Sequence, residues 1–171
     1  VLLTLPGTPW LYYGEEVGLH NPRGGGDEEK RTPMPWTADA TGFTEGVPWH
    51  PFAPGQDTAN VAAQTDDPQS LLSRYRRLIR VRQASQALRT GDLELVATSG
   101  AGGKAIAYLR TTDDQRVLVV HNLGDAAATV AWTLDTTGPH ELLFGDRGVG
   151  LPAGGSITLP ARATGVWEVQ R

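Results

Sequence analysis

The chain has 171 residues and no cysteine, so it contains neither disulfide bridges nor thiolate metal ligands. Because disulfides are rare in reducing compartments, the same absence favours a reducing, cytoplasmic location. No window approaches the roughly eighteen consecutive apolar residues that a membrane-spanning helix needs, which argues against a membrane partner. A net charge of −4 provides no basic surface for nucleic acid. With 39% hydrophobic and 20% charged residues, the composition is that of a globular protein.

Common catalytic and metal-binding patterns are also missing. The histidines, His20, His50, His121 and His140, are dispersed, without the i, i+4 spacing typical of a zinc site. The sequence has no Gly-x-Ser-x-Gly elbow and no phosphate-binding Gly-x-x-x-x-Gly-Lys loop. The acidic run at residues 27–29 matches no calcium loop and is interpreted as solvated charge. We therefore expect no metal site and no cofactor.

The N-terminal third combines an apolar start with a long irregular segment. Residues 1–13 hold two short runs of apolar and aromatic residues bounded by proline and glycine, which predicts a strand buried on both faces. Residues 18–65 are rich in proline and glycine and show no helical or strand periodicity, which predicts a loop. This loop carries large aromatic residues that a disordered linker would lack: Trp36, Phe43, Trp49 and Phe52. We therefore expect it to lie against another surface.

A helix is predicted over residues 67–84. Asp67 is the expected N-cap and Pro68 suits the first helical position. An apolar stripe recurs at three- and four-residue spacing: Leu71, Leu72, Tyr75, Leu78 and Ile79. The remaining surface carries five arginines: Arg74, Arg76, Arg77, Arg80 and Arg82. Because the chain is acidic and no aromatics interleave these arginines, we interpret them as a solvated or salt-bridged helix face rather than a nucleic-acid site.

The last part of the chain is predicted to be all β. Seven short segments rich in β-branched and apolar residues are separated by glycine, aspartate and proline turns: 93–97, 105–110, 117–122, 129–134, 141–144, 156–159 and 165–169. Such spacing is typical of an antiparallel sandwich. In the fourth segment Val130 and Trp132 alternate with Thr129 and Ala131, which predicts one core face and one wetter face.

Two strings at the N-terminal end resemble one place in a known enzyme family. The string LPGTPWLYYGEEVGL at residues 5–19 and the string RTPMPW at residues 31–36 resemble the eighth barrel strand and following loop of the α-amylase family, glycoside hydrolase family 13. The RLIRVR string at residues 77–82 resembles the last barrel helix of that family. The β zone is similar to its Greek-key C-terminal domain. The implied fold is mainly β: a remnant of a (β/α)8 barrel over residues 1–90, with one strand, one long loop and one helix, followed by an antiparallel Greek-key β-sandwich over residues 91–171.

The resemblance also implies a function. In this fold active sites lie at the C-terminal face of the barrel, where the loop after strand eight is found. Four residues are therefore expected to lie near a sugar: Tyr13, Glu16, Arg31 and Trp36. The second string looks most like enzymes acting on short α-glucosides, such as α-glucosidase, oligo-1,6-glucosidase and trehalose synthase. Pro35 departs from the glutamine of many such relatives, and residues 40–43 depart from their Asn-Ala-Gly-Phe, so the subfamily stays open.

The expected role of this chain is non-catalytic. Retaining hydrolysis needs two carboxyl groups about 5 Å apart, and the family carries them on strands before the eighth. Glu15 and Glu16 are sequence neighbours that point apart on an extended chain. We therefore expect the C-terminal piece of a glycosidase, with an oligosaccharide or α-glucan substrate in the intact parent. Its expected partners are the remaining barrel and, through residues 1–13, a second copy of the chain.

Other functions stay open. The β zone could be a carbohydrate-binding module, which would need exposed aromatic side chains. Trp132 and Trp167 lie in apolar patterns and are predicted core, which leaves Tyr108 and Phe144 for stacking. A further alternative is a parent of the trehalose-synthase type, a transglycosylase or isomerase. We favour a β-domain that stabilises the barrel, because no converging polar and aromatic group appears in it.

Overall fold

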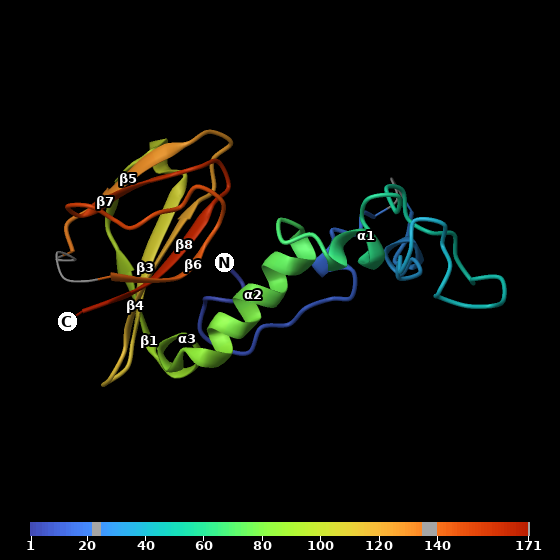
Figure 1. Ribbon diagram of the computed structural model, residues 1–171, viewed down its shortest axis with the longest axis horizontal. Helices are drawn as coiled ribbons and strands as arrows, with labels where there is room; N and C mark the ends of the chain where they lie inside the picture. The colour runs from blue at the N-terminus through green and yellow to red at the C-terminus, as the bar shows by residue number, and fades with distance from the viewer. Residues whose placement is uncertain (22–24, 135–139, 171) are drawn as a thin grey trace. The chain divides into compact units, whose positions relative to one another are not determined.

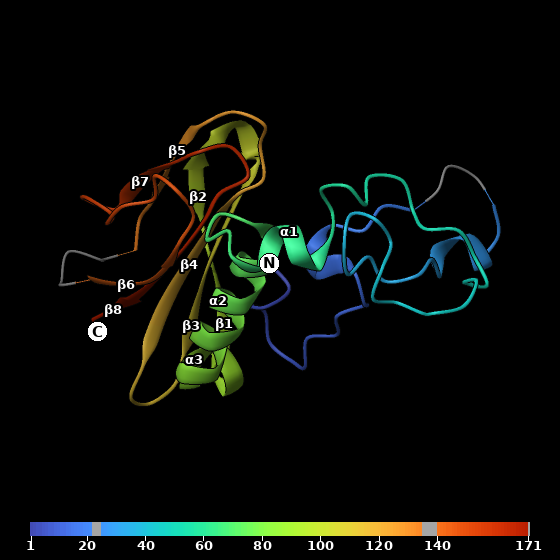
Figure 2. The same ribbon diagram turned by 45° about the vertical axis from the view of Figure 1, so that its right-hand side comes forward.

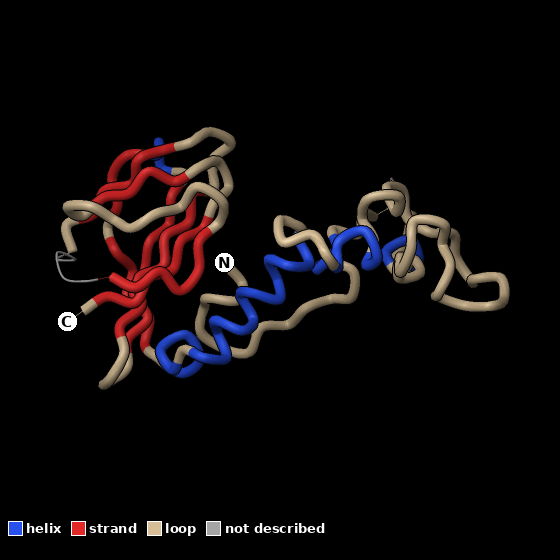
Figure 3. Tube along the Cα trace, viewed as in Figure 1, coloured by secondary structure: helices blue, strands red, loops and turns tan. Residues whose placement is uncertain are grey.

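The computed structural model describes residues 1–21, 25–134 and 140–170. The chain forms two compact units, one made of Val1–Pro9 with Leu78–Arg171 and the other of Trp10–Arg77. The first unit holds all the strands of the described residues, and the second consists mostly of loops with short helices (Figure 3). The protein is thus mainly β, as predicted. No helix in the described ranges is long and apolar enough to cross a membrane.

The strands form two antiparallel sheets (Figures 1 and 2). A five-stranded sheet has the order β1-β3-β4-β8-β6, and a three-stranded sheet has the order β2-β5-β7. Neighbours such as β4 and β8 are distant in sequence, so connections pass between the sheets. The bounds of the strands are β1 Asp92–Val96, β2 Thr98–Gly100, β3 Ala105–Thr111, β4 Arg116–Asn122, β5 Ala128–Trp132, β6 His140–Gly145, β7 Ser156–Leu159 and β8 Thr164–Val169.

All seven strands predicted in the last part of the chain are present. β5 ends at Trp132, two residues before the predicted end. The short strand β2 was not predicted, because its Thr-Ser-Gly sequence has no apolar residue and all three of its residues are exposed. Its place depends on pairing with β5, where Thr98 lies opposite Trp132.

Two apolar clusters cover the two faces of the five-stranded sheet. Leu118 and Val120 of β4 pack in a cluster with Trp132 and Trp167, between the two sheets. Val117 and Val119 face the other way and pack in a cluster with Tyr108, Phe144 and Leu88. Because both faces are covered, β4 is an almost continuous apolar run rather than an alternating one. Tyr108 and Phe144 are only 1% and 4% exposed, so the suggestion that they could stack on sugar is wrong.

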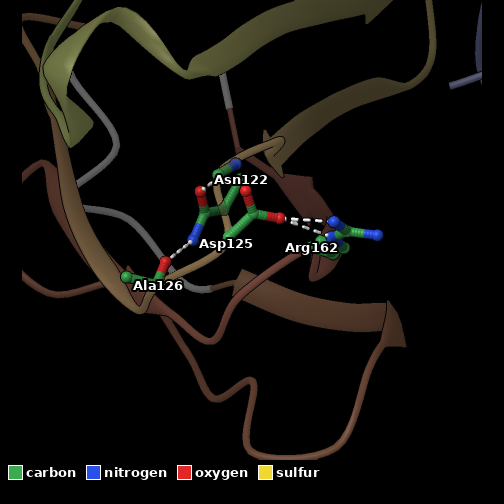
Figure 4. A network of polar contacts seen from close by, with 5 residues as sticks. Asn122, Asp125, Ala126 and Arg162 are labelled. Carbon is green, nitrogen blue, oxygen red and sulfur yellow. Dashed lines mark hydrogen bonds and ion pairs between the residues drawn. The ribbon is translucent and has the colours of Figure 1, made fainter.

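A network of polar contacts joins the loop after β4 to the loop before β8 (Figure 4). The buried Asn122 amide donates to the Ala126 carbonyl at 2.9 Å and to the Pro160 carbonyl at 2.8 Å. Arg162 has a left-handed backbone with φ 55° and donates from Nε to Asp125 at 2.8 Å. The Asn122 side-chain amide thus holds the two loops together, while the exposed Arg162–Asp125 ion pair adds little to stability.

The predicted helix is present, but it begins later than expected. Helix α2 covers Leu71–Ala84, not residues 67–84. Asp67 instead closes a turn by accepting a hydrogen bond from the Gln69 amide, and the Ser70 hydroxyl caps the helix by accepting from the Ser73 amide at 3.1 Å. A short helix α3, Gln86–Thr90, was not predicted and is capped by Ser85. The segment predicted as loop over residues 18–65 contains helix α1, Val61–Thr65, capped by Asn60.

Residues 1–13 form turns and irregular backbone, not the predicted strand. A strand needs neighbours to accept and donate its backbone hydrogen bonds, and no strand of the described residues pairs with this segment. Arginine side chains instead donate hydrogen bonds to several carbonyl groups of this segment. Arg82 donates to the carbonyls of Leu3 at 3.1 Å, Leu5 at 2.9 Å and Gly7 at 2.6 Å.

Arg82 therefore differs from the solvated arginines around it. Its side chain is 9% exposed, whereas Arg76, Arg77 and Arg80 are exposed. Arg82 continues the stripe of Tyr75 and Leu78 at four-residue spacing, which places it on the inner face of the helix. The prediction that all five arginines form a solvated or salt-bridged face is wrong for this residue, which is buried against backbone carbonyls.

Candidate functional site

The four residues predicted to lie near a sugar line one pocket of about 400 Å³. The pocket belongs to the unit Trp10–Arg77. It is lined by Tyr13, Glu16, Arg31, Thr32, Pro33, Met34, Trp36, Phe43 and Trp49. The first string contributes Tyr13 and Glu16, the second contributes Arg31 to Trp36, and Phe43 and Trp49 come from the segment that follows. These last two were recognised as loop aromatics but not assigned to the site.

Tyr13 connects the two strings. Its hydroxyl donates to the carbonyl oxygen of Thr32 at 2.9 Å. Burial and the neighbouring Tyr12 hydroxyl raise the pKa of Tyr13, while the charge of Arg31 acts in the opposite direction. The phenol therefore stays neutral near pH 7 and acts as a hydrogen-bond donor. Thr32 is 2% exposed, so the bond anchors the start of the second string against Tyr13.

Glu16 lies in a 3₁₀ turn, η1, Glu15–Val17, between two glycines with positive φ. At Gly14 a Cβ atom would lie 2.6 Å from the Leu19 side chain, so the turn requires glycine there. Glu16 lines the aromatic pocket, whereas Glu15 lines an adjoining pocket of about 500 Å³. The two carboxylates thus point apart, although the backbone is a 3₁₀ turn rather than the extended chain assumed from the sequence.

Gln64 holds this turn in place from helix α1. Its side-chain amide donates to the Val17 carbonyl at 2.8 Å, and its oxygen accepts from the Leu72 amide at 3.1 Å. Both ends of the amide are used, so Gln64 ties the Glu16 turn to the start of α2. Tyr75 on α2 has a pKa raised by burial and by the charges of Glu15 and Glu16.

Arg31 is balanced by an acidic neighbour. It follows the 3₁₀ turn η2, Glu28–Lys30, and forms an ion pair with Asp27 four residues earlier. Both side chains are more than half exposed, so solvent screens the pair. Arg31 lines both pockets, and Lys30 and Asp27 line only the adjoining one. The aromatic pocket itself therefore carries one carboxylate and one paired cation.

The aromatic wall is built from three side chains. Trp36 is anchored through its backbone, because its carbonyl accepts a hydrogen bond from the Ala62 amide at 2.9 Å. Ala62 is in the first turn of α1, where amides have no partner within the helix. Phe43 contacts Phe52 edge to face at 6.1 Å between ring centroids. Trp49 is 63% exposed and lies beside the His50 ring.

The arrangement suits a neutral, polar ligand with an apolar face. Aromatic faces pack against such a ligand, while Tyr13, Glu16 and Arg31 supply hydrogen bonds at the rim. In the described ranges no group of three histidine or acidic residues is placed to hold a metal ion. The chain thus combines an antiparallel β-sandwich with a loop-rich unit that carries an aromatic pocket.

Comparison with known proteins shows the family. Residues 1–91 match the sequence model of the α-amylase catalytic domain, and residues 106–166 match that of the α-amylase SusG C-terminal domain. The chain belongs to the α-amylase family, glycoside hydrolase family 13.

Relatives include a probable α-glucosidase of Rhizobium meliloti (strain 1021), which is 33% identical over 75% of this chain and 26% of its own length. The trehalose synthase of Thermus thermophilus is 39% identical over 72% of this chain and 14% of its length. The solved structure of a mutant trehalulose synthase MutB with the substrate sucrose has a TM-score of 0.85 at 27% identity, covering 99% of this chain and 37% of that protein. The chain thus spans about a quarter or less of the length of these two sequence relatives.

Proposed function

We propose that the pocket is part of the substrate-binding surface of a glycosidase acting on α-glucosidic bonds of short oligosaccharides. The observation that supports this is the convergence of Tyr13, Glu16, Arg31 and Trp36, from two separate strings, on one aromatic pocket. The matched relatives named for α-glucosidase and trehalose synthase activity support a small α-glucoside as the ligand.

The two parts of the chain are proposed to differ in role. Residues 1–90 contribute the last strand segment, loop and helix of a catalytic (β/α)8 barrel, and residues 91–171 form a β-sandwich that stabilises it. Chemistry in the intact enzyme follows the retaining mechanism, with two carboxyl groups about 5 Å apart supplied by the rest of the barrel. Glu15 and Glu16 line different pockets and do not form such a pair.

A parent of the trehalose-synthase type is the second candidate. It is favoured by 39% identity to the Thermus thermophilus trehalose synthase and 35% identity to a trehalose synthase/amylase of Mycolicibacterium smegmatis. A carbohydrate-binding role for the β-domain is less well supported, because its four aromatic side chains are all buried: Tyr108, Trp132, Phe144 and Trp167.

Titration of the labelled chain with maltose and isomaltose, followed by NMR, tests the proposal. The Trp36 indole signal is expected to shift saturably. In Trp36→Leu the signals of the other pocket residues are expected not to shift on addition of sugar. Trp10→Leu is the matched control, because Trp10 is 84% exposed and does not line the pocket. Cellobiose, with a β linkage, is the ligand control. No shift at high millimolar sugar, or shifts confined to residues 91–171, would overturn the proposal.

A further inference from the structure

The turn between Trp36 and Phe43 is closed around one carboxylate oxygen. Oδ1 of Asp39 accepts hydrogen bonds from the Thr37 hydroxyl at 2.7 Å, the Thr41 hydroxyl at 2.8 Å and the Thr41 amide at 3.3 Å. The two threonine hydroxyl oxygens are themselves 2.9 Å apart. Three donors from both sides of the turn therefore converge on a single atom.

The turn reverses the chain sharply. Ala40 and Gly42 both have positive φ, of 65° and 84°. Ala40 is not a glycine, so its left-handed backbone costs energy that the surrounding bonds must offset. A Cβ atom on Gly42 would lie 3.3 Å from the Cβ of Trp36, which shows how closely the returning chain approaches the tryptophan. Phe43 follows directly and lines the same pocket as Trp36.

The other hydrogen-bond contacts of the turn are the Ala40 amide with the Thr37 carbonyl at 3.3 Å and the Thr37 hydroxyl with the Thr41 carbonyl at 2.9 Å. Asp39 and Thr41 are exposed, so burial of apolar surface does not stabilise the turn. Hydrogen bonds from hydroxyl groups to an ionised carboxylate are stronger than those between neutral groups. The Thr37 hydroxyl first, and then the Thr41 hydroxyl and amide, hold the pKa of Asp39 below its usual range. The carboxylate is therefore charged at neutral pH, which is the form that accepts these bonds.

We propose that Asp39 is a positioning residue that sets where Trp36 and Phe43 lie in the aromatic wall of the pocket. Asp39 does not line the pocket, and neither do Thr37 and Thr41. Its effect passes through the 37–41 turn, which determines where Phe43 lies relative to Trp36. This inference rests on the proposed function for the identity of the ligand, but its geometric part concerns the free protein.

The test uses substitutions that remove donor or acceptor without altering the core. Asp39→Ala removes the acceptor, and Asp39→Asn keeps an acceptor oxygen without the charge. Thr37→Val removes one donor hydroxyl at nearly constant shape, while Thr37→Ser retains it. Asp57→Ala is the matched control, because Asp57 is an exposed aspartate of the same unit outside the pocket lining.

Two readouts separate this inference from the proposed function. Without sugar, the nuclear Overhauser contact between the Gly42 α protons and the Trp36 β protons is expected to disappear in Asp39→Ala and weaken in Thr37→Val. It should persist in Thr37→Ser and in Asp57→Ala. With maltose, affinity is expected to fall roughly five- to tenfold in Asp39→Ala, about the contribution of one aromatic contact. Thr37→Ser, which keeps the donor hydroxyl, should bind maltose as tightly as the wild-type chain.

A wild-type chain that does not bind maltose overturns the proposed function, and the proton contact then decides whether Asp39 shapes the turn. A contact that persists in Asp39→Ala overturns the inference whatever the sugar does. Loss of the contact with unchanged maltose affinity also overturns it, because the turn would then not position the binding wall.

Discussion

Arg110 of β3 donates a hydrogen bond from Nη1 to the carbonyl oxygen of Thr4, at 2.8 Å and 106 positions apart in sequence. The same guanidinium donates to the carbonyls of Leu88 at 3.1 Å and Gly91 at 2.8 Å. Arg110 is fully buried, and burial, together with nearby Arg82, lowers its pKa. In the described residues neither arginine forms an ion pair, so both serve as donors to backbone carbonyls.

Removal of Arg110 should destabilise the unit that contains the sandwich. In Arg110→Met three buried carbonyls lose their donor, and each buried unsatisfied group costs about 1–3 kcal/mol. We expect the free energy of unfolding to fall by about 3 kcal/mol or more in chemical denaturation. Arg89→Met, at an exposed position on α3, should change it by less than about 0.5 kcal/mol. Equal midpoints for the two variants would contradict this role.

Amide exchange should distinguish the N-terminal segment from the sheet. The carbonyls of this segment are held by arginines, but the amides of residues 7–13 make no hydrogen bond within the described ranges. We expect these amides to exchange quickly, while those of residues 117–121 in the central strand β4 exchange slowly. Light scattering tests the predicted self-association through residues 1–13. A monomer in which both segments are equally protected would contradict the proposal that residues 1–13 form a barrel strand only in the intact enzyme.

Trp132 should contribute strongly to the core. It is 7% exposed and packs between the sheets, so Trp132→Ala is expected to cost about 3–5 kcal/mol of unfolding free energy. Leu95→Ala is a suitable comparison, because Leu95 is 73% exposed on the edge strand β1. Thermal and chemical denaturation measure both. An unchanged midpoint for Trp132→Ala would mean that the indole is exposed in solution.

His50 should titrate above the usual histidine range. The Pro51 carbonyl at 2.9 Å raises its pKa, and Glu29 at 3.4 Å adds to this, against the opposing effect of burial. A raised pKa means that these contacts favour the folded state at low pH, and that this contribution is lost as pH rises through the folded pKa. An NMR titration should show the pKa falling in Glu29→Gln but staying above that of the denatured chain. A value unaffected by Glu29→Gln would show that the pair does not form.

The chain alone should not hydrolyse α-glucosides. Glu15 and Glu16 face different pockets, and retaining catalysis needs two opposed carboxyl groups. We expect glucose release from maltose, isomaltose and a nitrophenyl α-glucoside at the level of buffer, with an intact α-glucosidase as positive control. Turnover that co-purifies with the chain and disappears in Glu16→Gln would contradict this expectation.

Local sequence signals predicted the β-domain well and the pocket only in part. Runs such as residues 117–122 and the turn residues between them act within a few positions, so they predict strands without knowledge of the partners. The two strings also identified Tyr13, Glu16, Arg31 and Trp36. Phe43 and Trp49 were visible as aromatics, but their place in the pocket depends on the path of the loop, including the turn before Phe43, whose hydrogen bonds no periodicity reveals.

The composition class, the seven strands of the β-domain, the helix and the two strings follow from local propensity and from motif identity, so they could be predicted without a structure. Which of these tendencies forms regular structure depends on contacts in the folded chain. Residues 1–13 have the composition of a buried strand, yet strand formation depends on neighbours that supply backbone hydrogen bonds. Arg82 lies among solvated arginines in sequence, but its helical position faces the N-terminal carbonyls, which gives a buried guanidinium its partners. Burial and pairing are properties of contacts between distant segments, and only the folded chain determines them.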